Sequence, residues 1–124
     1  MGERILVTGG ARSGKSSHAL ALARQRADGP MGFIATAVAF DEEMADRIRR
    51  HKEERGDEFL LFEEPRDLGR ITEEAAEECS VAVIDCLTVW LGNLYGAERD
   101  DKAVRDTISE TKERIAAVDC GIIL

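Results

Sequence analysis

A glycine-rich stretch near the amino terminus constrains the fold of this chain more than any other feature. Residues 9–16 read GGARSGKS and match GxxxxGK[ST] at every fixed position. A β-branched apolar run, residues 5–8, precedes the stretch, and residues 15–26 carry apolar side chains at helical spacing. Backbone N–H groups of such a loop point inward at phosphate oxygens, and the following helix adds the positive end of its dipole. The sequence therefore predicts a phosphate-binding loop formed by Gly9, Gly10, Ala11, Arg12, Ser13, Gly14, Lys15 and Ser16.

Three residues of this predicted site carry specific chemistry. Lys15 is expected to reach the β- and γ-phosphates, and Ser16 to ligate Mg²⁺. Asp85 ends the most apolar run of the chain, a position where an acid often holds Mg²⁺ in proteins with this loop. The alternatives are a chance glycine-rich turn for the loop and a helix-capping or turn residue for Asp85. His18 follows the loop closely and is expected to be structural.

Apolar periodicity predicts strands alternating with helices along the whole chain. The predicted strands are residues 5–8, 32–36, 59–62, 81–85 and 120–124, and the predicted helices are 15–26, 41–55, 67–78, 88–95 and 100–118. This alternation favours a P-loop NTPase-like α/β fold with three layers, in which helices cover both faces of a mainly parallel sheet. The strands at 5–8 and 81–85 are expected to lie close together because both feed one phosphate site.

Length and composition bound the domain organisation. We expect one domain over residues 1–124, and we expect the chain to be a fragment, because it ends on an apolar strand with no covering helix. The net charge of −8 argues against a nucleic-acid binder. No apolar run approaches the roughly 20 residues of a membrane span, and the amino terminus shows no signal-peptide pattern, so a cytoplasmic protein is expected.

Cysteine usage also excludes some classes of protein. The three cysteines, Cys79, Cys86 and Cys120, are odd in number and form no CxxC pair. A disulfide framework or a zinc site is therefore not expected, and reduced, mostly buried thiols are.

A second cluster of interest lies on the predicted helix at 41–55. His51 continues an apolar stripe with Met44 and Ile48, and it shares a helix face with Arg47 and Arg55. One interpretation is a helix-end histidine stabilised by the dipole. The other is a nucleophile or base beside a phosphate that the arginines neutralise, since neighbouring cations lower the pKa of an imidazole. The residues alone leave both interpretations open.

Five segments in order carry a family resemblance: GGARSGKSSHA, FIATA, DEEMADRIRRHK, FEEP and VIDCLT. Together they resemble the bifunctional adenosylcobinamide kinase/adenosylcobinamide-phosphate guanylyltransferases of cobalamin biosynthesis, over residues 5–124. The resemblance implies that a nucleoside triphosphate, ATP or GTP, phosphorylates the corrinoid substrate adenosylcobinamide. It further implies that a histidine takes GMP from GTP and passes it to adenosylcobinamide phosphate. A homotrimer is implied as well.

Carried over by position, the resemblance implies further site residues. His51 is the guanylylated histidine, and the remaining positions form the nucleotide site: Ala35, Thr36, Ala37, Lys52, Glu53, Glu54, Arg55, Glu63 and Asp85. The chain departs from the family in two respects. The family continues with a segment containing Asn-Glu-Val-Gly and further helices, and Arg50 stands where some relatives carry a second histidine.

Two other functions compete with this one. The first is a nucleotide-binding switch or regulatory module without covalent chemistry, for which residues 36–41 are the best candidate for a loop that senses the γ-phosphate. The second is an inactive truncated domain. Some family members transfer only GMP, and the sequence leaves open whether the kinase step is retained.

Overall fold

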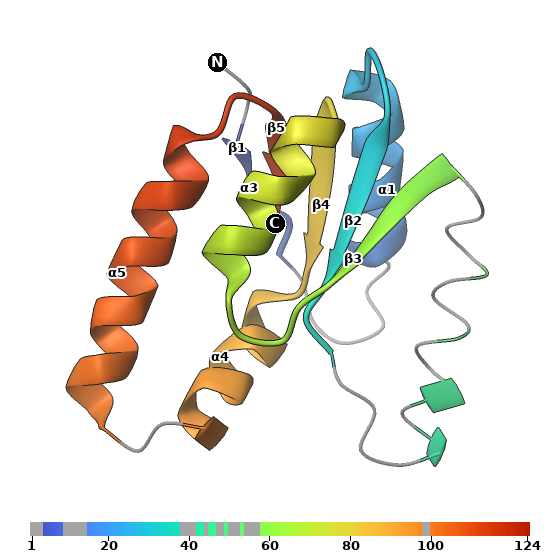
Figure 1. The fold of residues 1–124 in the computed structure, drawn as a ribbon. Coiled ribbons are helices and arrows are strands. Elements are labelled where there is room, and N and C mark those ends of the chain that lie inside the picture. Colours follow the sequence, from blue (N-terminus) through green and yellow to red (C-terminus); the bar gives the residue numbers. More distant parts are fainter. Residues whose placement is uncertain are drawn as a thin grey trace.

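The computed structural model describes residues 4–8, 15–37, 58–97 and 100–124, together with positions 42, 43, 45, 46, 49 and 53. At its centre is a parallel sheet in the order β1-β5-β4-β2-β3 (Figure 1). Its strands are β1 (Arg4–Ile5), β2 (Met31–Ala35), β3 (Phe59–Glu63), β4 (Val81–Asp85) and β5 (Gly121–Ile123). The helices are α1 (Lys15–Arg26), α3 (Leu68–Glu78), α4 (Leu87–Ala97) and α5 (Asp101–Ala117). The predicted three-layer α/β fold is therefore confirmed.

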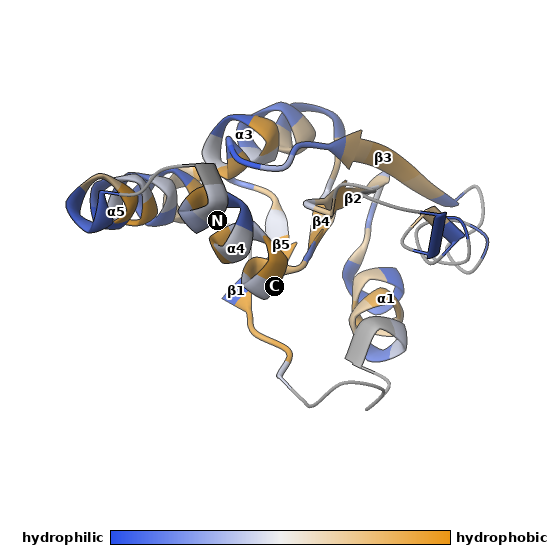
Figure 2. Cartoon of the chain, turned by 90° about the horizontal axis from the view of Figure 1, so that it is seen from below, coloured by the Kyte–Doolittle hydropathy of each residue, from blue (hydrophilic) through white to orange (hydrophobic). Residues whose placement is uncertain are grey.

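Helices cover both faces of this sheet. Figure 2 shows α1 on one face and α3, α4 and α5 on the other. Strand β4 serves both sides, because Val81 and Val83 join the apolar cluster under α1, whereas Ala82 and Ile84 join the cluster under the other three helices. Burial on both faces explains why this strand reads as an uninterrupted apolar run rather than an alternating one.

Most helix boundaries follow from local signals. Asp67 accepts a hydrogen bond from the N–H of Arg70 (3.3 Å) and caps α3. Asp100 accepts one from the N–H of Lys102 (3.1 Å) and caps α5. One boundary is wrong: α4 runs through Gly96, which the sequence predicts as its end. A Cβ at Gly96 would meet nothing within 4 Å, so this glycine is an ordinary exposed helix position.

The expected proximity of the strands at 5–8 and 81–85 is corrected by the sheet order. Strand β5 lies between β1 and β4 and pairs with both. The reason is burial: Ile122 and Ile123 of β5 are 0% and 1% exposed, whereas Arg4 and Ile5 of β1 are half-buried. The strand that needs cover on both faces takes the inner position, and the short strand that leads to the glycine-rich loop takes the edge.

One arginine fastens β1 to the end of α5. The Arg4 guanidinium donates to the backbone carbonyls of Ile115 (3.2 Å), Cys120 (2.9 Å) and Val118. These carbonyls lie in the last turn of α5 and directly after it, where helix carbonyls lack partners within the helix. Beyond β1 itself, Leu124 donates to the Ile5 carbonyl (2.8 Å) and Val7 donates to the Leu124 carbonyl (2.9 Å). The edge strand is therefore held at both of its ends.

The predicted helix at 41–55 falls mostly outside the described residues. The six described positions within it, 42, 43, 45, 46, 49 and 53, have helical backbone. In the part of the chain that the structure describes, no helix is long and apolar enough to span a membrane.

Candidate functional site

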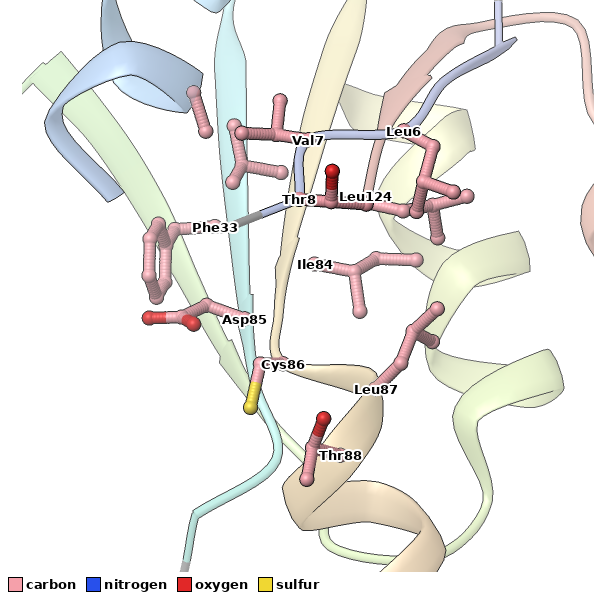
Figure 3. Close-up of a pocket in the computed structure, with 12 residues that line it drawn as sticks. Leu6, Val7, Thr8, Phe33, Ile84, Asp85, Cys86, Leu87, Thr88 and Leu124 are labelled. Carbon is pink, nitrogen blue, oxygen red and sulfur yellow. The ribbon is translucent and has the colours of Figure 1, made fainter. Parts of the chain in front are cut away.

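A pocket opens at the carboxyl ends of β1, β4 and β5. Its volume is about 260 Å³, and its walls are mostly apolar. The polar lining comes from Asp85 and Cys86 at the end of β4, Thr88 at the start of α4, and Thr8 after β1 (Figure 3). Ligand sites of open parallel sheets form at this edge, outside the carboxyl ends of the strands. The glycine-rich loop follows Thr8 directly in the sequence, so we expect the predicted phosphate site at this end of the sheet.

Three predicted site residues lie in one row across neighbouring strands. The register places Ala35 of β2 opposite both Glu63 of β3 and Asp85 of β4. Residues abreast in a parallel sheet point to the same face, and two residues earlier that face carries Phe33 and Val83, which pack under α1. Ala35, Glu63 and Asp85 therefore lie on the side of the sheet where α1 begins. Sequence reasoning assigned these three to one site, and the fold brings them together.

Asp85 is the acid best placed to hold a metal. It is partly exposed, and its side chain projects at the pocket (Figure 3). No residue that the structure describes donates a hydrogen bond to its carboxylate or forms an ion pair with it. Mg²⁺ is typically bound through one or two carboxylates together with water and phosphate oxygens, and a single acid beside a phosphate loop fits that chemistry. Among the described residues there is no cluster of three or more histidines, cysteines and acids.

The sequence predicts that Thr36 lines a nucleotide pocket, but its side chain is buried. It is fully buried at the end of β2. Its hydroxyl donates to the carbonyl of Cys86 (2.9 Å) and accepts from the N–H of Cys86 (3.0 Å), and its own N–H donates to the carbonyl of Asp85 (3.1 Å). The Thr36 side chain thus fastens the end of β2 to the end of β4, and its neighbours Ala35 and Ala37 remain partly exposed.

Two residues that sequence reasoning missed hold the same edge from α4. The Asn93 amide donates to the carbonyls of Thr36 (2.8 Å) and Pro65 (2.9 Å). The indole N–H of Trp90 donates to the carbonyl of Arg66 (2.8 Å). The sequence does contain a signal for them, since an asparagine and a tryptophan lie three residues apart in a mostly apolar predicted helix. Buried polar groups need hydrogen-bond partners, so these two side chains could have been expected to hold other segments.

The FEEP segment divides its two acids between different tasks. Glu63 is exposed at the end of β3. The Glu64 carboxylate accepts from the N–H groups of Arg66 (3.1 Å) and Asp67 (3.3 Å) and from the guanidinium of Arg70 (2.6 Å). Burial by itself would raise the pKa of Glu64, but these hydrogen bonds and the Arg70 charge outweigh it and lower that pKa. Glu64 organises the turn into α3, whereas Glu63 lies exposed at the end of β3, opposite Ala35.

Several predicted residues lie outside the described part of the chain. They are Gly9, Gly10, Ala11, Arg12, Ser13, Gly14, His51, Lys52, Glu54 and Arg55. Lys15 and Ser16 begin α1, but their side chains are likewise not described. Glu53 is exposed on the helical segment, and His18 is exposed on α1. The roles assigned to all these residues stay predictions.

Comparison with known proteins gives the family. Residues 5–124 match the family described as cobinamide kinase / cobinamide phosphate guanyltransferase. This chain belongs to that family. The cobinamide kinase family resemblance drawn from the five sequence segments is thus confirmed over nearly the whole chain.

Members of the cobinamide kinase family from three bacteria are similar to this chain. The bifunctional adenosylcobalamin biosynthesis protein CobP of Pseudomonas aeruginosa is 43% identical over 91 residues, which is 73% of this chain and 52% of that protein. The bifunctional adenosylcobalamin biosynthesis proteins CobU of Escherichia coli and Salmonella typhimurium are 37% and 43% identical over 99 and 101 residues. Each of these two alignments covers 77% of this chain and 54% of the relative. The chain spans about half the length of the curated relatives it matches.

Proposed function

We propose that this chain acts in both reactions of its family: phosphorylation of adenosylcobinamide, and transfer of GMP from GTP to adenosylcobinamide phosphate. The observation that carries the proposal is the family match over residues 5–124. The row of Ala35, Glu63 and Asp85 beside the start of α1 supports it, because it brings carboxylates to the edge of the sheet that precedes the predicted phosphate loop. A corrinoid substrate, a homotrimeric assembly and a cytoplasmic location belong to the same proposal.

In the proposed nucleotide site, the backbone of residues 9–14 and the Lys15 ammonium bind the triphosphate of ATP or GTP. Ser16 and Asp85 would hold Mg²⁺, which when bound neutralises charge on the phosphates. The pocket beside Asp85 is apolar on most of its walls, and such walls limit the water that competes for these contacts. Phosphorylation then needs only a substrate hydroxyl placed in line with the γ-phosphorus, since phosphoryl transfer is catalysed largely by positioning and charge.

For guanylyl transfer we assign the nucleophile to His51. A neutral imidazole nitrogen attacks the α-phosphorus of GTP, a nitrogen–phosphorus bond forms, and the bond to the departing pyrophosphate breaks. In the second half-reaction a phosphate oxygen of adenosylcobinamide phosphate attacks the same phosphorus, and the imidazole leaves. The arginines and lysine around position 51 would neutralise the phosphates and keep the imidazole unprotonated.

Incubation with GTP followed by peptide mapping tests this assignment. We expect a GMP adduct on the peptide that contains residue 51, and we expect His51→Ala to abolish it. Lys15→Ala should cripple the kinase step. His18→Ala is the matched control, because His18 is exposed on α1 and the only other histidine of the chain.

Undiminished labelling of the His51→Ala protein would remove the covalent mechanism. GTP binding with no adduct in the unsubstituted protein would favour the switch hypothesis instead. An absence of Mg²⁺–GTP binding by calorimetry would favour an inactive domain.

A further inference from the structure

Helix α4 holds the carboxyl ends of three strands at once. Asn93 and Trp90 hold the turn after β3 through the carbonyls of Pro65 and Arg66. The end of β4 is held directly, because the N–H of Trp90 donates to the carbonyl of Cys86 (3.1 Å) and that of Val89 to its sulfur (3.5 Å). Asn93 also holds the end of β2 through the carbonyl of Thr36 (2.8 Å). The three strands that carry the row of site residues therefore share one support.

Thr36 is the junction of this support. Its carbonyl accepts from α4, its hydroxyl both donates to and accepts from the backbone of Cys86, and its N–H donates to Asp85. The residue is 0% exposed, so no water competes for these bonds. Threonine is the side chain that fits here, because valine would match its shape but would leave the N–H of Cys86 unpaired in the interior.

The junction joins the end of β2 to the end of β4 at Asp85 and the residue after it, Cys86. The end of β4, on the other side of the junction, presents Asp85 to the pocket. The geometry points to the Thr36–Asn93 pair as a positioning device, which holds the end of β4, and with it Asp85, in place beside the ends of β2 and β3.

This inference rests on the proposed function, and it adds two positioning residues to it. Neither side chain needs to contact the nucleotide, because Thr36 is buried and both hydrogen bonds of the Asn93 amide go to backbone carbonyls. Loosening the pair is expected to slow transfer at saturating GTP, while nucleotide binding in the absence of Mg²⁺ changes little. A shift of about 1 Å between reacting groups is enough to cost on the order of 100-fold in rate.

The test compares four substitutions in the full 124-residue chain. Thr36→Val keeps the shape and removes the hydroxyl, and Thr36→Ser keeps the hydroxyl. Asn93→Ala removes the amide from a half-buried position and serves if Thr36→Val fails to fold. Thr72→Val is the matched control, because Thr72 is also 0% exposed and its hydroxyl donates to a carbonyl, that of Leu68 (2.7 Å), within α3 and away from the strand ends.

Two quantities are measured: the rate of GMP labelling at saturating GTP, and the factor by which Mg²⁺ tightens GTP binding relative to EDTA. We expect Thr36→Val and Asn93→Ala to lower the labelling rate at least about tenfold and to reduce the Mg²⁺ factor, with the GTP Kd in EDTA within about threefold of the unsubstituted protein. Thr36→Ser should retain most of the rate, and Thr72→Val should retain all of it.

Equal labelling by the unsubstituted and Thr36→Val proteins would overturn the inference, as would an equal loss in Thr72→Val. If the unsubstituted protein binds GTP without labelling, the covalent mechanism fails separately. The Mg²⁺ factor then decides the positioning role: a factor unchanged in both Thr36→Val and Asn93→Ala would reject it.

Discussion

The two edges of the sheet are held together by different chemistry. At the carboxyl edge, neutral side chains fasten the strand ends: Thr36 links β2 to β4, and Asn93 links α4 to β2 and to the turn after β3. At the amino edge, the guanidinium of Arg4 fastens β1 to the end of α5 through several carbonyls. Both edges are ordered by side chains that donate to backbone carbonyls, but only one of them uses a charge to do so.

The difference shows where charge is kept available for a ligand. At the carboxyl edge neutral side chains donate to the backbone of the strand ends, the charges of Glu64 and Arg70 are paired with each other, and the Asp85 carboxylate lines the pocket with no donor among the residues the structure describes. The Arg4 charge at the other edge is directed at backbone carbonyls. A charge already satisfied inside the fold is a poor binding group, so the comparison predicts that function concentrates at the edge where the Asp85 carboxylate has no donor among the described residues.

The largest expected effect tests the carboxyl edge. Asp85→Asn should lower the Mg²⁺-dependent rate of GMP labelling by about 100-fold, the loss typical of removing one charge-stabilising group from an active site. The free energy of unfolding should change by no more than about 0.5 kcal/mol, because no described residue depends on this carboxylate. Labelling kinetics and urea denaturation measure the two quantities. A strongly destabilised variant would show that the Asp85 carboxylate has a structural role and would contradict the proposed difference between the two edges.

The next effect tests the amino edge. Arg4→Met keeps the apolar stem and removes the guanidinium, so the carbonyls at the end of α5 lose a charged donor. We expect the free energy of unfolding to fall by about 2–3 kcal/mol. Arg105→Met is the control: Arg105 is 75% exposed and paired only within its helix with Asp101, and its loss should cost less than about 1 kcal/mol. Equal costs for the two arginines would contradict a special role for Arg4.

A smaller effect concerns close packing beside the amino edge. A Cβ on Gly32 would lie 2.9 Å from the sulfur of Cys79 and 3.4 Å from the ring of Phe62. Gly32→Ala should therefore lower the free energy of unfolding by about 1–2 kcal/mol. In the double variant with Cys79→Ala, thermal unfolding should show that part of this loss is recovered. If the two losses of unfolding free energy were strictly additive, the Cys79 sulfur would not be the cause of the destabilisation by Gly32→Ala.

The last effect is confined to alkaline pH and concerns stability. Burial, helped by the neighbouring Cys120 and Glu78, raises the pKa of the Cys79 thiol to about 11. The unfolded thiol has a pKa of about 8.5, so the folded state retains the proton to higher pH. The stabilisation is complete below about pH 8.5 and is lost as the pH rises toward 11. Urea denaturation at pH 8 and pH 10.5 under reducing conditions should show a smaller decline for Cys79→Ala; an identical decline would contradict the assignment.

The parts of the fold that the sequence predicts correctly depend on local signals. The apolar run of β4, the approximate bounds of α3 and α5 and the helix after the glycine-rich loop all follow from residues close in sequence. The grouping of Ala35, Glu63 and Asp85 followed from the family resemblance, and the strand register then gave it a physical basis.

The parts that escaped prediction depend on contacts distant in sequence. Thr36 forms hydrogen bonds with Cys86 and Asn93, which lie 50 and 57 residues away in the sequence. No sequence pattern near Thr36 predicts either partner. The inner position of β5 is likewise a matter of competition among strands for burial, which the order of strands along the chain does not reveal. In both cases local periodicity predicts the helices and strands, but tertiary packing determines which of them are in contact.

The edge position of β1 has a consequence for how the protein is made. Residues 4 and 5 are synthesised long before residues 122 and 123, with which their strand pairs among the described residues. Contacts this far apart in sequence form late, since the intervening chain must be ordered first. During synthesis the segment that leads into the glycine-rich loop thus lacks its strand partner until the residues of β5 have been added. The nascent polypeptide is therefore expected to gain nucleotide affinity abruptly, at the end of this stretch of translation rather than gradually along it.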